Sequence, residues 1–223
     1  MGQTIDFSRP DGKTCRGYLA TPAAGDRAPG LVVLQEWWGL NDQIKGVADR
    51  YAEAGYRTLV PDLYHGKLAT TAEDAQQLMG SLDWGQATTQ DIRGALQHLA
   101  VGGARVGVTG FCMGGALTIL TCVQAPEPVA AVCFYGIPPA AAADPARIKV
   151  PLLGHFAIHD DWCDAAAVGA LERSLQAGAV PHTIHRYDAR HAFMNEHRPD
   201  VYDAACAKTA WERTLAFWKQ HLG

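Results

Sequence analysis

Short apolar runs alternate with amphipathic segments along most of the chain. The apolar runs cover residues 30–35, 56–60, 105–109, 129–135, 151–157 and 182–187, and they are typical of buried strands. Apolar positions at helical spacing occur over 42–54, 71–79, 88–100, 113–124, 165–177 and 201–221. Strands and helices that alternate in this way predict a mostly parallel sheet covered by helices on both faces, a three-layer α/β sandwich.

The ends of the helices and the loops between them indicate one continuous unit. Gly178 follows the segment 165–177, and we expect it to end that helix as a glycine just past the last turn. The final helix carries an apolar stripe that we expect to pack into the core, formed by Ala204, Ala207, Trp211, Leu215, Trp218 and Leu222. The loop 137–143 is too short to divide domains, so we expect a single domain over residues 1–223.

Composition and charge narrow the function classes. Of the 223 residues 48% are apolar and 19% are charged, and the net charge of −4 is spread without blocks of one sign. We therefore expect no nucleic-acid or anionic-membrane partner. The longest apolar stretch, 129–143, is interrupted by Gly136, Pro138 and Pro139, which argues against a membrane span. The first residues, 1–6, match neither a signal peptide nor a myristoylation site.

The cysteines lack the paired spacing of a disulfide framework. They stand at positions 15, 112, 122, 133, 163 and 206. We expect reduced thiols in a cytoplasmic protein, present as a monomer or a homodimer. The loop after the first buried strand, 36–39, is EWWG and not a glycine-rich phosphate loop, so no nucleotide cofactor is expected.

The segment 110–115 (GFCMGG) places Cys112 between an apolar strand and a helix. In the α/β-hydrolase fold a nucleophile stands at such a sharp strand–turn–helix junction, where the residues two before and two after it must be small. Here both are glycine, Gly110 and Gly114. The start of the following helix favours a thiolate. The alternative is a buried cysteine in a glycine-rich turn.

A cysteine nucleophile needs a base and an acid to orient that base. In this fold they follow in the order nucleophile, acid, histidine, each after a strand. Asp160 or Asp161 follows the strand 151–157, and His191 follows the strand 182–187. Register favours Asp160, whereas Asp164 is expected to cap the next helix. The nearby group His155, His159, Asp160, Asp161 and Cys163 has an alternative interpretation as a metal site, although its spacing is unusual for zinc.

The oxyanion formed by attack on a carbonyl needs two backbone donors. We expect the N–H of Met113, directly after the nucleophile, and the N–H of Trp37, in the loop after the first buried strand. Trp37, Trp38, Met79 and Phe193 are candidates for an apolar acyl pocket, with ordinary core or rim packing as the alternative.

Four segments together resemble the dienelactone hydrolase family, the carboxymethylenebutenolidases. They are 32–36 (VVLQE), 61–64 (PDLY), 110–115 and the His191 loop, and the resemblance runs from about residue 14 to the C-terminus. It implies an α/β-hydrolase fold and a triad of Cys112, His191 and Asp160. It also implies that Glu36 lies beside the nucleophile, bonds the thiol at rest and is displaced by substrate.

Two substrate-binding arginines that the resemblance implies have no counterpart in this sequence. Ala72 or a neighbour stands at the first position and Asn195 at the second. An amide cannot replace a bidentate arginine, although Arg93, Arg190 or Arg198 could reach the site from elsewhere. We therefore expect a small ester or lactone, with a neutral or weakly polar one at least as well suited as a dienelactone.

The resulting hypothesis is a hydrolase that works through a thioester on Cys112, with no metal or organic cofactor. Two other classes stay open. The first is a non-catalytic binding protein on the same scaffold. The second is a thiol redox protein, which would need a resolving cysteine near Cys112.

Overall fold

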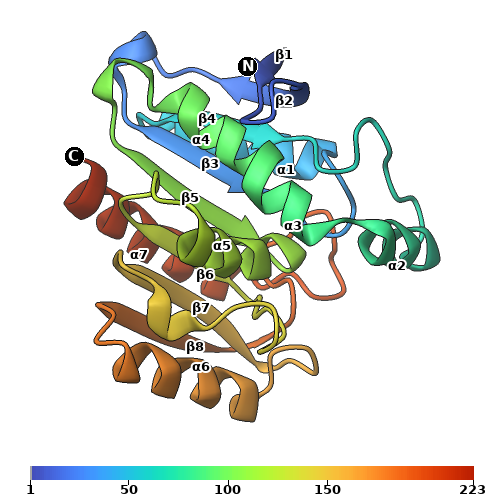
Figure 1. Cartoon of the computed structure of the whole chain (residues 1–223). Helices are drawn as coiled ribbons and strands as arrows, with labels where there is room; N and C mark the ends of the chain where they lie inside the picture. The colour runs from blue at the N-terminus through green and yellow to red at the C-terminus, as the bar shows by residue number, and fades with distance from the viewer. Residues whose placement is uncertain (1) are drawn as a thin grey trace.

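The computed structural model describes residues 2–223, and its eight strands form one sheet (Figure 1). The strands are β1 (Gln3–Ser8), β2 (Thr14–Ala20), β3 (Gly30–Leu34), β4 (Arg57–Pro61), β5 (Val106–Phe111), β6 (Ala131–Phe134), β7 (Leu152–His159) and β8 (His182–Arg190). Their order is β1-β2-β4-β3-β5-β6-β7-β8. β1 and β2 pair antiparallel with each other, and β2 with β4, while the other pairs are parallel. The prediction of a mostly parallel sheet is confirmed. Met1, at which the expected domain begins, lies outside the described residues.

All the α-helices except α4 and α5 begin at a side chain that accepts a hydrogen bond from a free backbone N–H group. They are α1 (Asp42–Glu53), α2 (Ala72–Ser81), α3 (Trp84–Gln86), α4 (Arg93–Leu99), α5 (Met113–Gln124), α6 (Ala165–Ala177) and α7 (Ala204–Leu222). Asn41 caps α1, Thr71 forms a capping box with Asp74 on α2, and Asp203 caps α7. Asp164 caps α6 as expected, accepting from the Ala167 N–H at 2.7 Å.

Two hydrophobic cores lie on the two faces of the sheet. Alternate residues of β3 point into different cores. Val32 and Leu34 belong to the first core, and Leu31 and Val33 belong to the second. The first core contains the apolar faces of α4, α5 and α6, and the second contains those of α1 and α7. Figure 1 shows α4, α5 and α6 together on the near face of the sheet. The period of two along a strand thus produces the three layers.

β1 and β2, the two outermost strands on one side of the sheet, are not predicted from the sequence. Both strands carry polar, exposed residues at alternate positions, so they lack the continuous apolar run of the inner strands. The segment 88–100 is also not one regular helix. A π-helical stretch, Ala87–Ile92, precedes α4 and follows the short α3.

The boundaries of other elements differ from expectation for local reasons. The last helix begins at Ala204 and not at 201, because Asp203 caps it there. Gly178 is the residue that ends α6, but its φ is −81°, and Ala179 takes the left-handed conformation with φ 52°. A side chain at Gly178 would collide with the backbone of Ala146, so close approach and not backbone freedom requires glycine there.

The stripe on α7 packs against the sheet for most of its length. Ala207, Trp218 and Leu222 are buried, and Trp211 and Leu215 are half-buried, whereas Ala204 in the first turn is exposed. Among residues 2–223, no helix is both long and apolar enough to cross a membrane.

The carboxyl ends of the parallel strands bring distant segments to one edge of the sheet. β3 ends before Glu36 and Trp37, β5 before Cys112, β7 before Asp160 and β8 before His191. In open α/β sheets, ligands bind at this edge.

Candidate functional site

Cys112 stands at a strained turn between β5 and α5. Its φ is 55° and its ψ is −116°, a conformation that residues other than glycine rarely adopt. The turn is held because the Cys112 N–H donates to the Phe134 carbonyl at 3.0 Å, and the Cys112 carbonyl accepts from the Ala116 N–H at 3.1 Å. The thiol is half-buried. This backbone conformation directs the side chain away from the sheet, so that Cys112 lines a cavity.

The glycines around Cys112 are required by contact with neighbouring backbone. A Cβ on Gly110 would collide with the Gly114 carbonyl, and one on Gly114 with the Leu34 carbonyl. A Cβ on Gly115 would collide with the Phe134 carbonyl. The expectation of small residues two positions before and after the cysteine is thus confirmed sterically.

His191 and Asp160 form a short hydrogen bond at the same edge of the sheet. His191 Nδ1 lies 2.7 Å from Asp160 Oδ2. The other oxygen, Asp160 Oδ1, accepts from the backbone N–H groups of Trp162 at 2.8 Å and Cys163 at 3.0 Å. Asp161, the other candidate acid, is exposed. Of the two aspartates, Asp160 is therefore the one that binds the imidazole of His191.

The charges of this pair stabilise each other. Burial alone would raise the pKa of Asp160, but the bonds from His191 and from the two backbone N–H groups outweigh it and lower that pKa. Burial likewise opposes a charged imidazole, yet Asp160 and the Cys112 sulfur outweigh it and raise the pKa of His191 to about 10. His191 Nε2 is buried and has no hydrogen-bond partner within residues 2–223. One ring nitrogen of His191 is therefore bonded to Asp160, and the other has no hydrogen bond to the described residues.

Glu36 is buried next to the nucleophile and is bound by two neutral side chains. Tyr135 donates its hydroxyl proton to Oε1 at 3.2 Å, and the Asn195 amide donates to Oε2 at 2.7 Å. Burial raises the pKa of Glu36, although both bonds and the charge of His191 oppose that rise. No hydrogen bond joins Glu36 to the Cys112 thiol among the described residues, so the expected resting contact is replaced by these two.

Asn195 stands where the resemblance leads one to expect an arginine. The side chain of Asn195 is 2% exposed and turns toward Glu36. An arginine here would make an ion pair with the carboxylate and hold its charge. The amide satisfies one oxygen without adding a charge.

Tyr64 links the two residues whose backbone N–H groups we expect to bind the oxyanion. Its hydroxyl donates to the Trp37 carbonyl at 3.2 Å and lies 3.3 Å from the Met113 sulfur. The turn that carries Tyr64 is fixed by Asp62, whose carboxylate accepts from the N–H groups of Tyr64 at 3.2 Å and Gly66 at 2.6 Å. The PDLY segment thus connects the end of β4 to the site, a role that the sequence alone did not suggest.

A cavity of about 1080 Å³ opens over these residues. Its lining includes Glu36, Trp37, Cys112, Met113, Asp160 and His191, together with Met79. The prediction that Trp38 and Phe193 belong to the acyl pocket is wrong, since neither residue lines the cavity. Phe193 is fully buried and packs on the ring of Tyr135, while the Trp38 ring packs edge-on against Trp37.

Several apolar or aromatic residues of the cavity wall are not predicted from the sequence. They come from the start of α3, the loop after β6, the end of β7 and the loop after it, and are Trp84, Tyr135, Ile137, Ile158 and Trp162. Trp162 is 63% exposed, and its ring packs edge-on against Trp37. The one available signal was a tryptophan within the aspartate-rich segment 160–164.

Two of the three candidate arginines reach the cavity. Arg190 and Arg198 line it, and Arg198 is paired with Asp200 at 2.6 Å. Arg93 does not line it, because its guanidinium pairs with Glu127 at 2.7 Å.

The alternative metal group does not assemble in the structure. His155 is fully buried and bonds Tyr187 at 2.7 Å and Thr214 at 3.0 Å, while His159 pairs with Asp188 at 2.8 Å on the surface. Within residues 2–223, the metal-type cluster that the side chains do form is Cys15, His65 and Asp91. Burial raises the pKa of the Cys15 thiol, and Cys15 lies within strand β2 and not at a turn, so it is not placed as a nucleophile.

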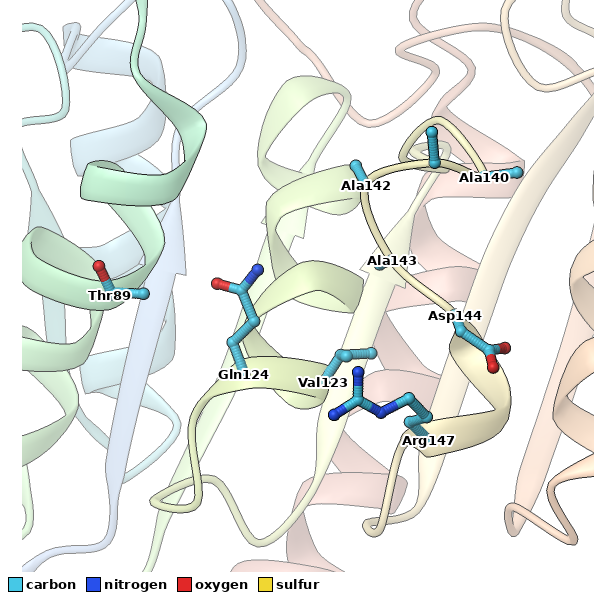
Figure 2. A pocket seen from close by; sticks show the side chains of 9 residues that line it. Thr89, Val123, Gln124, Ala140, Ala142, Ala143, Asp144 and Arg147 are labelled. Atoms are coloured by element: carbon cyan, nitrogen blue, oxygen red, sulfur yellow. The ribbon is translucent and has the colours of Figure 1, made fainter.

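Figure 2 shows another hollow, of about 480 Å³, beside the end of α5. Thr89, Gln124 and the alanines 140–143 line it, with Asp144 and Arg147 as its charged residues. It contains no cysteine or histidine, so it offers no nucleophile and base for acyl transfer.

All six cysteines are free thiols, as expected. Cys122, Cys133 and Cys163 are buried, and burial raises the pKa of each thiol. Buried thiols of high pKa are inert, which argues against these three as resolving cysteines for Cys112.

The chain is similar to proteins of a known family over nearly its whole length. The model of the dienelactone hydrolase family matches residues 15–222. A relative named "Protein usf" from Aquifex pyrophilus is 36% identical over 233 residues, covering 100% of both chains. A protein of Aquifex aeolicus, named "putative carboxymethylenebutenolidase", is 33% identical and also covers 100% of both chains.

A solved structure shows the same architecture. The crystal structure of a "putative dienelactone hydrolase" from Klebsiella pneumoniae superposes with a TM-score of 0.85 and 26% identity, covering 99% of each chain. These similarities do not favour a non-catalytic or redox protein. The chain belongs to the dienelactone hydrolase family, with the α/β-hydrolase fold, and is a hydrolase of ester or lactone substrates.

Proposed function

We propose that this hydrolase cleaves a small ester or lactone with a catalytic triad of Cys112, His191 and Asp160. The observation that carries the proposal is the 2.7 Å bond from Asp160 to His191 beside a cysteine in a strained strand–helix turn. Asp160 holds the imidazole by Nδ1, which leaves Nε2 for proton transfer.

The reaction proceeds in two halves. The Cys112 thiolate attacks the substrate carbonyl, and the N–H groups of Met113 and Trp37 bind the oxyanion. The His191 imidazolium gives its proton to the departing alkoxide, leaving a thioester on Cys112 and a neutral imidazole. That imidazole then removes a proton from water, whose oxygen attacks the thioester. The acid product leaves, and the thiolate–imidazolium pair is restored.

Glu36 tunes the site without taking part in bond making. Because Tyr135 and Asn195 hold its carboxyl group, Glu36 does not compete with His191 for the Cys112 thiol.

The cavity wall supports an apolar acyl group. Trp37, Met79, Trp84 and Trp162 provide apolar surface, and the charge of Arg198 is balanced by Asp200. We therefore expect the methyl ester of a carboxylate-bearing lactone to be turned over at least as fast as the anion. A preference for the anion of tenfold or more would assign Arg190 and Arg198 to carboxylate binding and refute the apolar assignment.

Replacing the nucleophile tests the triad directly. Cys112→Ala should abolish turnover of an activated ester, while Cys206→Ala serves as the matched control, because Cys206 is also half-buried but lies on α7 away from the cavity. Rapid quenching of wild-type enzyme should trap one acyl group per chain on Cys112, detected by mass spectrometry. Wild-type turnover by Cys112→Ala would overturn the assignment.

A further inference from the structure

A second group of Cys, His and Asp side chains lies outside the catalytic cavity, where β2, the turn after β4 and the π-helical stretch meet. Cys15 comes from β2, His65 from the turn and Asp91 from the π-helical stretch. Their donor atoms all lie within 4.8 Å of one another. The proposed ester hydrolysis uses none of them.

We propose that Cys15, His65 and Asp91 form a binding site for a divalent transition-metal ion of the zinc class. A thiolate, an imidazole and a carboxylate are the three kinds of ligand that zinc takes from proteins. Three protein ligands leave a fourth position for water. Two of the ligands, His65 and Asp91, line a cavity of about 280 Å³ together with Asp83 and Gln86, from which such a water could enter.

The separation of His65 and Asp91 fits two ligands of one ion better than a hydrogen bond between the two side chains. His65 Nε2 lies 3.6 Å from Asp91 Oδ2, which is too long for a hydrogen bond. Two ligand atoms of a tetrahedral zinc ion are separated by roughly 3.3 to 3.6 Å, as follows from the usual zinc–nitrogen, zinc–oxygen and zinc–sulfur lengths. The Cys15 sulfur makes weak contacts to the carbonyls of Arg16 at 3.3 Å and Asp62 at 3.9 Å, and it lies next to the Asp91 carboxylate.

The backbone holds two of the ligands in unusual conformations. His65 has a φ of 51°, in the left-handed region that is uncommon for residues other than glycine, and its side chain is 58% exposed. Asp91 lies in a π-helical stretch, a form that often marks functional positions, and its side chain is 3% exposed. The ion would therefore be reached from the His65 side.

Arg9 completes the charge balance. It donates to Asp91 Oδ1 at 2.9 Å, which leaves Oδ2 for the ion, and it pairs with Asp11 at 2.7 Å through its other nitrogen. When the ion binds, the Cys15 S–H bond breaks, the proton passes to solvent and a sulfur–metal bond forms. The two positive charges of the ion then meet the thiolate and Asp91, while Asp11 compensates Arg9. A carboxylate held by a second hydrogen bond is the usual arrangement around protein-bound metals.

Cobalt(II) is the probe for this site, because a cobalt–thiolate bond has its own near-ultraviolet absorption. Purified protein is dialysed against a chelator and titrated with Co²⁺. We expect saturation at one equivalent per chain, a thiolate-to-cobalt band, and loss of that band when Zn²⁺ is added. Cys112→Ala should keep the band, which separates this site from the catalytic thiol.

His65→Asn is the decisive variant. Asparagine tolerates the left-handed backbone, and the side chain it replaces is exposed, so the fold should persist while the imidazole ligand is lost. We expect this variant and Cys15→Ser to lose the band and the rise in Tm that Zn²⁺ causes in wild type. A band that survives in His65→Asn, a band that disappears in Cys112→Ala, or no saturable binding by wild type would overturn the proposal. Ester turnover of Cys15→Ser should equal that of wild type.

Discussion

The hydroxyl of Tyr64 should matter more for turnover than for substrate binding. It donates to the Trp37 carbonyl at 3.2 Å and touches the Met113 sulfur, so it braces the peptide segments that carry both proposed oxyanion donors. Tyr64→Phe removes this brace and keeps the ring. Loss of one hydrogen bond of this kind costs about 1 kcal/mol of folding stability.

The expected effect on rate lies below that of deleting a donor. Loss of an oxyanion-hole donor lowers kcat by about 10²- to 10³-fold. Because Tyr64→Phe only loosens the Trp37 segment, we expect kcat to fall about tenfold, with KM within about twofold of wild type.

Steady-state kinetics on an activated aryl ester measure this split. Tyr56→Phe is the matched control, since Tyr56 is also buried, lies outside the cavity and makes no side-chain hydrogen bond among residues 2–223. It should leave kcat unchanged. If Tyr64→Phe changed only KM, or lowered kcat no more than Tyr56→Phe, Tyr64 would not position the oxyanion donors.

Three further predictions concern the triad and its turn. Asp160→Asn should lower kcat/KM by about 10²- to 10⁴-fold, because the imidazole loses its charged partner. Asp161→Asn should leave kcat/KM within about twofold of wild type. Equal effects of the two variants in ester assays would contradict the assignment of the acid. The folded pKa of His191, about 10, exceeds the unfolded value near 6.5, so the stability from its charge is fully present below about pH 6.5 and is lost as pH rises to about 10. Urea unfolding of wild type and His191→Gln should therefore show a difference that shrinks over this interval, and a widening difference would refute the cause given for the shift. Gly110→Ala should lower the free energy of unfolding by about 1 to 3 kcal/mol, because the new Cβ would collide with the Gly114 carbonyl. Gly46→Ala, on a helix and facing open space, should raise the free energy of unfolding by about 0.5 to 1 kcal/mol. In thermal melts, the Tm values of the two variants should move in opposite directions.

Local sequence determined the inner strands and the nucleophile turn, because both depend on neighbouring residues. The buried run before Cys112 specifies β5, and Gly110 and Gly114 allow a turn that no larger side chain could occupy. The order of Cys112, Asp160 and His191 also indicated one edge of the sheet, since each follows a parallel strand.

Tertiary contacts decided what one strand or turn cannot specify. Asp160 and Asp161 are adjacent and chemically identical in the sequence, and only the fold brings the first within 2.7 Å of His191. Asn195 bonds to Glu36 across 159 residues, and Phe193 turns into the core instead of the cavity. Local propensity acts over a few residues, whereas these contacts depend on how distant segments pack. The sequence alone therefore determined which residues could react, and the tertiary structure decided which of them meet.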